Sequence, residues 1–72
     1  MNREKIVKQL EEIMNLDDNT RNKLFDIVNK YPLRKIIVAY KILYSKALDK
    51  NMRVKNKVTI EEFEKVLRRV RF

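Results

Sequence analysis

The spacing of apolar residues along the chain predicts four helices. After Asn2, a typical N-cap residue, apolar side chains recur every three or four positions and predict a first helix over about residues 3–14. Its expected buried face consists of Ile6, Val7, Leu10, Ile13 and Met14. Asn15 follows, and because asparagine tolerates left-handed backbone angles, we expect it to close this helix in a chain that contains no glycine.

Pro32 separates the second predicted helix from the third. Asp17 or Asp18 is expected to cap the second helix, whose apolar positions are Leu24, Phe25, Ile27, Val28 and Tyr31. Pro32 has no amide hydrogen and restricts the preceding residue, so it ends that helix. The same proline suits the first turn of a third helix over about residues 32–50, the longest of the four.

The third predicted helix has two kinds of apolar residue. Eight of them fall in an arc of about 140°, wide enough to contact two other helices. These are Leu33, Ile36, Ile37, Tyr40, Leu43, Tyr44, Ala47 and Leu48. Val38 and Ile42 lie outside the arc among basic residues, so they are covered by the fourth helix or the segment before it, or they form a protein interface.

The clearest helix start in the chain is at Thr59. Residues 51–58 alternate apolar with basic side chains and predict a short extended segment. Thr59 with Glu62 then forms a capping box, and Val58 with Phe63 is placed to form a hydrophobic staple. The apolar positions that follow are Ile60, Phe63, Val66, Leu67 and Val70. The sequence therefore predicts an all-α fold, a compact four-helix bundle with a long central third helix, in a single domain over residues 1–72.

The charge of the chain is concentrated in its second half. Eighteen Lys and Arg stand against ten Asp and Glu, which gives a net charge of +8 and a pI near 10.0. Residues 1–30 hold six bases and six acids, whereas residues 31–58 hold eight bases and one acid, Asp49. This asymmetry favours a polyanion or an acidic protein surface as partner, although a solvated basic face without a ligand would show the same pattern.

The eight bases of residues 31–58 are the candidate nucleic-acid-binding residues. They are Arg34, Lys35, Lys41, Lys46, Lys50, Arg53, Lys55 and Lys57. Lysines outnumber arginines, and no aromatic residue is interleaved with the bases of residues 50–57. This composition favours contact with phosphates over base reading or stacking, so little sequence specificity is expected. The sequence does not distinguish DNA from RNA.

Residue types exclude several classes of chemistry. The absence of Cys and His excludes a zinc site, an iron–sulfur cluster, a haem ligated by His or Cys, a disulfide and a Cys or Ser/His nucleophile. We therefore expect no catalytic residue, no metal site and no cofactor. The longest apolar run is Ile36–Tyr40, so no secretory or membrane-spanning segment is predicted and an intracellular, cytoplasmic location is expected.

Three stretches together resemble a known family. Residues 17–30, 34–48 and 58–70 resemble the small helical lid domain that follows the nucleotide-binding core in AAA+ ATPases; the third stretch begins Val58-Thr59-Ile60-Glu61-Glu62-Phe63. In that family the long helix carries small residues such as Ala39 and Ala47, and the last helix begins with V-T-x-E-D/E-F. The histone fold is similar more weakly, through a long helix, a short extended loop and a V/I-T-x-E-D start. The resemblance implies a helical adaptor module within DNA-handling machinery.

This resemblance does not extend to ATP hydrolysis. A chain without glycine has no P-loop, and the lid family's phosphate-reaching arginine, which corresponds to Arg34, would need an ATPase core from another chain. Two functions are therefore expected. One is non-catalytic association with nucleic acid through phosphate contacts. The other is an accessory subunit of a larger replication or transcription enzyme, with Val38 and Ile42 as the interface to that enzyme or to a second copy of the chain.

Overall fold

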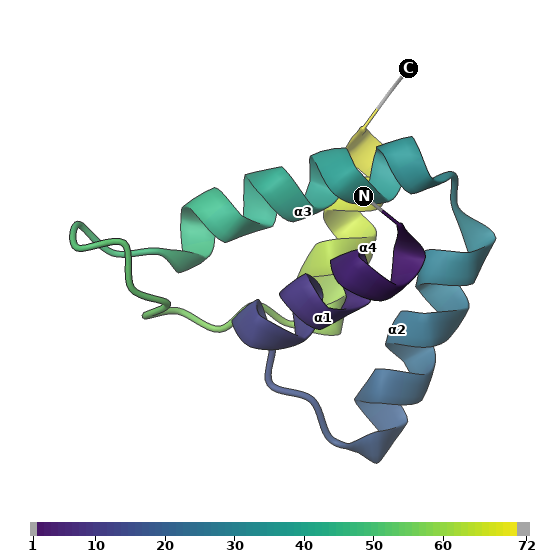
Figure 1. The fold of residues 1–72 in the computed structure, drawn as a ribbon, viewed down its shortest axis with the longest axis horizontal. Coiled ribbons are helices and arrows are strands. Elements are labelled where there is room, and N and C mark those ends of the chain that lie inside the picture. The colour runs from purple at the N-terminus through teal and green to yellow at the C-terminus, as the bar shows by residue number, and fades with distance from the viewer. Residues whose placement is uncertain (1, 71–72) are drawn as a thin grey trace.

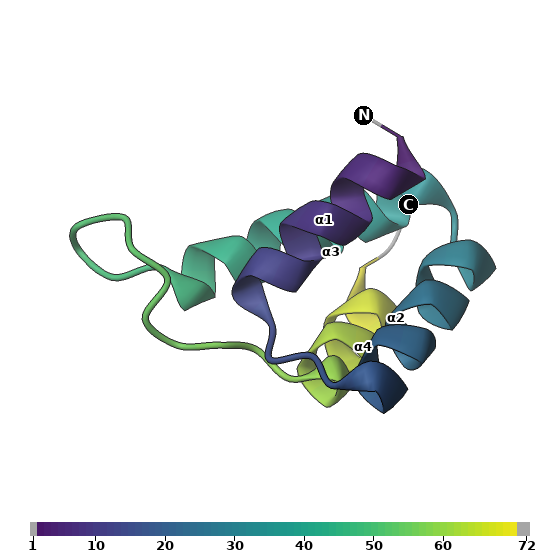
Figure 2. The ribbon, with the colours of Figure 1, turned by 60° about the horizontal axis from the view of Figure 1, so that its bottom comes forward.

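The computed structural model describes residues 2–70 and consists of four α-helices. They are α1 (Arg3–Ile13), α2 (Asp18–Lys30), α3 (Leu33–Ala47) and α4 (Ile60–Arg69). The described residues form no strand beyond two isolated bridges, so the all-α prediction is confirmed. Figure 1 shows α3 lying across α1 and α4, with α2 along the right-hand side, and Figure 2 gives a second view of the same arrangement.

All four helices contribute to one apolar core. α3 packs against α4 and α1, and α2 packs against α1 and α4. Phe63 of α4 is the largest of the fully buried side chains. The buried residues are Ile6, Val7, Leu10, Ile13, Met14, Leu24, Ile27, Val28, Ile36, Ala39, Leu43, Ala47, Val58, Ile60, Phe63 and Leu67. Every apolar position predicted for the first helix is therefore in the core.

The predicted N-terminal caps are present. The side chain of Asn2 accepts a hydrogen bond from the amide of Lys5, and that of Asp17 accepts one from the amide of Thr20. At α4, the Thr59 hydroxyl accepts from the amide of Glu62 at 3.1 Å and lies 3.4 Å from the Glu62 carboxylate, to which it donates. These bonds satisfy backbone donors that have no partner within the helix.

Removal of the Thr59 cap should lower stability measurably. We expect Thr59→Ala to cost about 1 kcal/mol of unfolding free energy, because it leaves the Glu62 amide without its acceptor. Thermal unfolding followed by circular dichroism measures the change. Thr59→Ser is the matched control, since it keeps the oxygen and should retain most of the stability; equal midpoints for the alanine and wild-type proteins would contradict the assignment.

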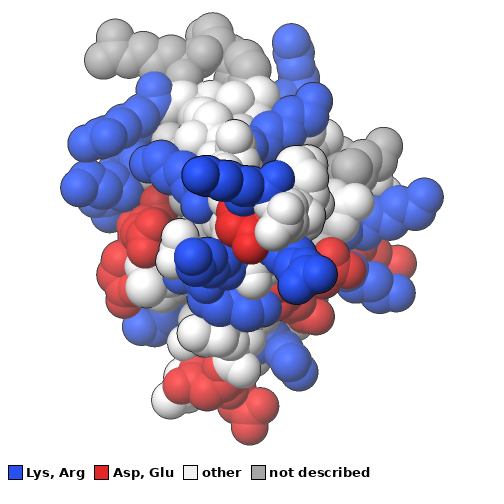
Figure 3. All heavy atoms as spheres, turned by 90° about the vertical axis from the view of Figure 1, so that its left-hand side faces the viewer, with Lys and Arg blue, Asp and Glu red and all other residues white. Residues whose placement is uncertain are grey.

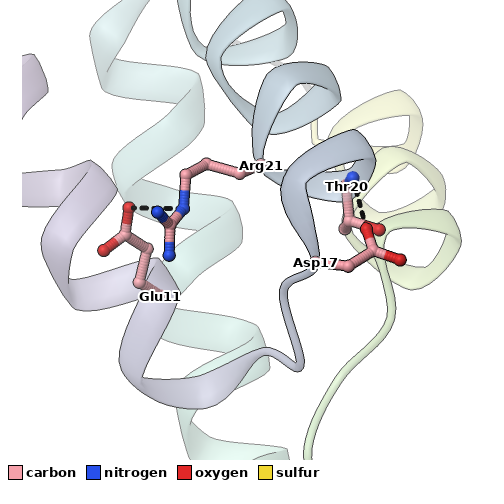
Figure 4. A network of polar contacts seen from close by, with 4 residues as sticks. All are labelled: Glu11, Asp17, Thr20 and Arg21. Carbon is pink, nitrogen blue, oxygen red and sulfur yellow. Dashed lines mark hydrogen bonds and ion pairs between the residues drawn. The ribbon is translucent and has the colours of Figure 1, made fainter.

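The Asp17 cap should make stability depend on pH. The hydrogen bond from the Thr20 amide, drawn in Figure 4, and the neighbouring Thr20 side chain lower the pKa of the Asp17 carboxyl from its usual 3.8. Because the unfolded chain then binds the proton more readily, the cap's contribution is complete above about pH 4 and is lost as the pH falls through the lowered pKa. We expect the stability difference between wild type and Asp17→Asn to change only in this acidic range. A difference that stays constant from pH 6 to pH 2 in denaturant titrations would contradict it.

The C-terminus of α1 differs from the prediction. Asn15 was expected to be left-handed, but Met52, with φ of 62°, is the one described non-glycine residue with positive φ. The carbonyl groups at the C-terminal end of α1 instead accept hydrogen bonds from residues far along the chain. The amide of Val58 donates to the Ile13 carbonyl at 2.8 Å, and Lys57 Nζ donates to the Glu12 carbonyl at 2.8 Å. With these donors in place, the helix end needs no left-handed residue.

The third helix is shorter than predicted, and its buried face is rotated about the helix axis relative to the predicted face. It ends at Ala47 rather than near residue 50, because the Ala47 carbonyl accepts from the amides of Lys55 and Asn56. Pro32 stands at the N-cap and not in the first turn. The buried stripe is Ile36, Ala39, Leu43 and Ala47, while the other predicted core positions of this helix are half-buried. The stripe is thus displaced toward Ala39, and Val38 and Ile42 come to lie at its edge.

Phe25 is not in the core. Its side chain is 44% exposed beside Val7 and Val28, although the sequence predicted that it would pack inward with the rest of α2. Leu24, Ile27 and Val28 alone fill the buried face of α2. Periodicity placed Phe25 next to this face, and only the relative position of α1 shows that it lies outside.

Candidate nucleic-acid interface

The basic loop, residues 49–57, is organised by its single acid. Asp49 Oδ1 accepts hydrogen bonds from the amides of Asn51 and Arg53, at 2.8 and 3.0 Å. The backbone of Asp49 makes two more hydrogen bonds. Its amide donates to the Arg53 carbonyl, and its carbonyl accepts from the Met52 amide. An aspartate that accepts from amides two and four residues on closes a tight turn. The one carboxylate of residues 31–58 is therefore directed at the loop's own backbone.

Both ends of the basic loop are attached to helices. Leu48 pairs with Val54 in an antiparallel bridge, and Val58 pairs with Met14, directly after α1, in a parallel bridge. Figures 1 and 2 show the loop extending beyond the helices at the left of the molecule. The backbone that carries Lys50, Arg53 and Lys55 is thus held at its base while their side chains are exposed.

The structure does not bring the eight predicted bases into one site. Lys50, Arg53 and Lys55 are exposed on the basic loop, and Lys46 lies in the last turn of α3 next to it. Arg34 lies in the first turn of α3, and at 1.5 Å per residue it is about 18 Å from Lys46 along the axis, with Lys41 between them. Figure 3 looks onto the loop end and shows many Lys and Arg side chains over it, with acidic side chains between them.

Among the predicted binding residues, Lys57 and Lys35 have defined partners within the fold, and Arg34 is also in contact with another residue. Lys57 bonds to the Glu12 carbonyl at the C-terminal end of α1, where the helix dipole favours a positive charge. The Lys35 ammonium lies 5.2 Å from the centre of the Tyr31 ring, a cation–π geometry. The contact of Lys57 joins residues 45 positions apart, so it depends on the fold, whereas Lys35 contacts a residue four positions before it, across Pro32.

Arg3 is a further base with a role in the fold that the sequence did not indicate. Its guanidinium donates to the carbonyl of Val28 and, at 3.1 Å, to that of Tyr31, at the C-terminal end of α2. Lys57 acts in the same way at α1, so two bases of the chain serve helix ends. The charge count alone includes them among the residues available to a partner.

Val38 and Ile42 lie beside the second half of α4. Val38 is half-buried and Ile42 is 40% exposed. Both line a hollow between α3 and α4 with Lys46, Val66, Arg69 and Val70. The fourth helix therefore covers part of this pair and leaves part accessible. The sequence places Val66 and Val70 on the apolar face of α4, and the packing of α4 against α3 brings them to this hollow.

The described residues show neither a metal-binding cluster nor a membrane-spanning helix. Residues 2–70 contain no group of three or more acidic side chains arranged to hold a metal ion. None of the described helices is long and apolar enough to cross a membrane. Comparisons with family models, with curated proteins and with solved structures found no match. The candidate site is therefore defined by its own geometry.

Proposed function

We propose that the protein binds nucleic acid through phosphate contacts made by Lys50, Arg53 and Lys55 of the basic loop together with Lys46. The observation that carries this proposal is the turn at Asp49. Three exposed bases follow Asp49 within six residues, and the Asp49 carboxylate accepts hydrogen bonds from the loop backbone. A net charge of +8 adds long-range attraction to a polyanion.

The proposed mode of binding is contact with the backbone of the nucleic acid. The basic loop has no aromatic side chain on which a base would stack, and three of its four exposed bases are lysines, which act as point charges. Such contacts give orientation and affinity without reading sequence. Acidic side chains stand between the bases at this end, so the binding is expected to be moderate and sensitive to salt.

We further propose that the four helices act as a bundle with α3 as its central element, in the manner of an adaptor in DNA-handling machinery. α3 has 15 residues, more than α1, α2 or α4, and packs against α1 and α4. This arrangement supports the proposal because a long helix with packed neighbours holds the loop at its end. Catalysis has no part in it.

Fluorescence anisotropy with labelled duplexes tests this function. Several duplexes of equal length and unrelated sequence should bind with affinities within about threefold of one another, because phosphate contacts carry no sequence information. A preference of a thousandfold or more for one sequence, the order that base reading gives, would contradict phosphate contact as the mode. Absence of binding to every duplex and single strand at low salt would reject the proposal.

A further inference from the structure

We propose that the groove between α3 and α4 binds a short acidic amphipathic helix of another protein. Lys46 belongs to both surfaces, but this inference does not depend on nucleic-acid binding, because it rests on the apolar floor of the groove. The proposal gives a role to Val38, Ile42, Val66 and Val70, the apolar side chains that remain partly exposed between α3 and α4.

The groove is formed by two adjoining hollows that share Lys46, Val66 and Arg69. The first has a volume of about 290 Å³, slightly below the range typical of small-molecule pockets, and its apolar lining is Val38, Ile42, Val66 and Val70. The second continues toward the start of α4, as far as Glu62. From Glu62 to Val70 the groove follows α4 for about 12 Å, which corresponds to about two turns of a docked helix.

The charges at the edge of the groove select an acidic occupant. Lys46, Lys65 and Arg69 line it, and within residues 2–70 no ion pair joins them to an acid. Glu62 is the one acid of the described lining, and its carboxylate accepts a hydrogen bond from the Thr59 hydroxyl. Arg68, by contrast, pairs with Glu64 at 3.5 Å. An occupant with carboxylates on both sides of its apolar stripe would complement these three bases.

The same charges disfavour a second copy of this chain as the occupant. Two grooves facing each other would bring six bases together on chains that each carry +8. An amphipathic helix with apolar residues at positions i, i+4 and i+7 would instead set one stripe on Val38, Ile42 and Val66, as helices do in apolar grooves elsewhere.

The test uses a synthetic peptide of about 15 residues, longer than the two turns of the groove, with leucines at i, i+4 and i+7, glutamates on both sides of this stripe and alanines elsewhere. Methyl NMR spectra recorded during titration should show shifts at Val38, Ile42, Val66 and Val70. A peptide of equal composition with its leucines dispersed should bind on the order of tenfold more weakly, because it keeps the charge and loses the stripe.

Two variants locate the binding site. Ile42→Asp should weaken peptide binding on the order of tenfold, while Phe25→Asp, at a residue of similar exposure on the α1–α2 side, should leave it unchanged. If Ile42→Asp does not fold, the double variant Lys65→Glu/Arg69→Glu is used instead, since both residues are exposed. This double variant should bind a peptide in which lysines replace the glutamates more tightly than the original peptide. Equal binding of the dispersed peptide, shifts outside the groove, or a wild-type dimer that Ile42→Asp dissociates would each overturn the proposal.

Discussion

Replacing Lys50, Arg53 and Lys55 together with alanine is expected to weaken binding to duplex DNA by about ten- to a hundredfold at low salt. Each of these exposed bases is proposed to neutralise one phosphate and release its counterion. The slope of log affinity against log salt should therefore flatten by about 3, and all sequences should be affected alike. Anisotropy titrations at several salt concentrations measure both quantities.

The matched control replaces Lys5, Lys8 and Lys23, three exposed lysines of α1 and α2, with alanine. It removes the same three charges from a part of the chain outside the basic loop. Lys57 is left unchanged in both variants, because its bond to the Glu12 carbonyl would mix a change in stability with a change in binding. If the control weakened binding as much as the loop variant, total charge and not the loop would be responsible.

Phe63→Ala is expected to have the largest effect on folding. Phe63 is fully buried in a core to which all four helices contribute. Truncation of a buried phenylalanine typically costs about 3–5 kcal/mol. A domain of this size has a total stability of only about 4–11 kcal/mol. Circular dichroism should show a strongly lowered unfolding midpoint or the loss of most helical signal at room temperature.

Phe25→Ala provides the control for this change, since the same atoms are removed from a side chain that is 44% exposed. We expect a cost well below that of Phe63→Ala, because a partly exposed ring is already in contact with water and leaves no cavity. Similar losses for the two variants would show that the core is arranged differently.

The local parts of the fold were predictable because their causes are local. An N-cap bond joins residues three apart, so Asn2, Asp17 and Thr59 were recognisable from their side chains and the residues that follow. The position of Pro32 in the same way fixed the break between α2 and α3. Helical periodicity identified the buried face of α1 for the same reason.

The features that sequence missed are those set by contacts between distant segments. The end of α1 is satisfied by Lys57 and Val58, and the end of α2 by Arg3, so no nearby residue signals either contact. The packing of α4 and α1 against α3 sets which face of α3 is buried. The packing of α2 against α1 and α4 leaves Phe25 outside the core. A pattern at 100° per residue defines an arc but leaves its edges undetermined.

The candidate site was predictable as a charged region but not as a surface. The excess of bases in residues 31–58 is visible in the sequence, whereas the turn at Asp49 decides which of them stand together. Arg34 belongs to the same run of charge but lies at the opposite end of α3 from the basic loop. Each residue of a helix adds about 1.5 Å along the axis, so a long helix places the first and last bases of a charged segment far apart.

The most direct measurement is the salt dependence of wild-type binding to a labelled duplex. If Lys46, Lys50, Arg53 and Lys55 each meet a phosphate, log affinity plotted against log salt should fall with a slope of about −3 to −4. Binding should also be nearly the same for unrelated sequences. A slope close to zero, or no detectable binding at low salt, would contradict the proposed function.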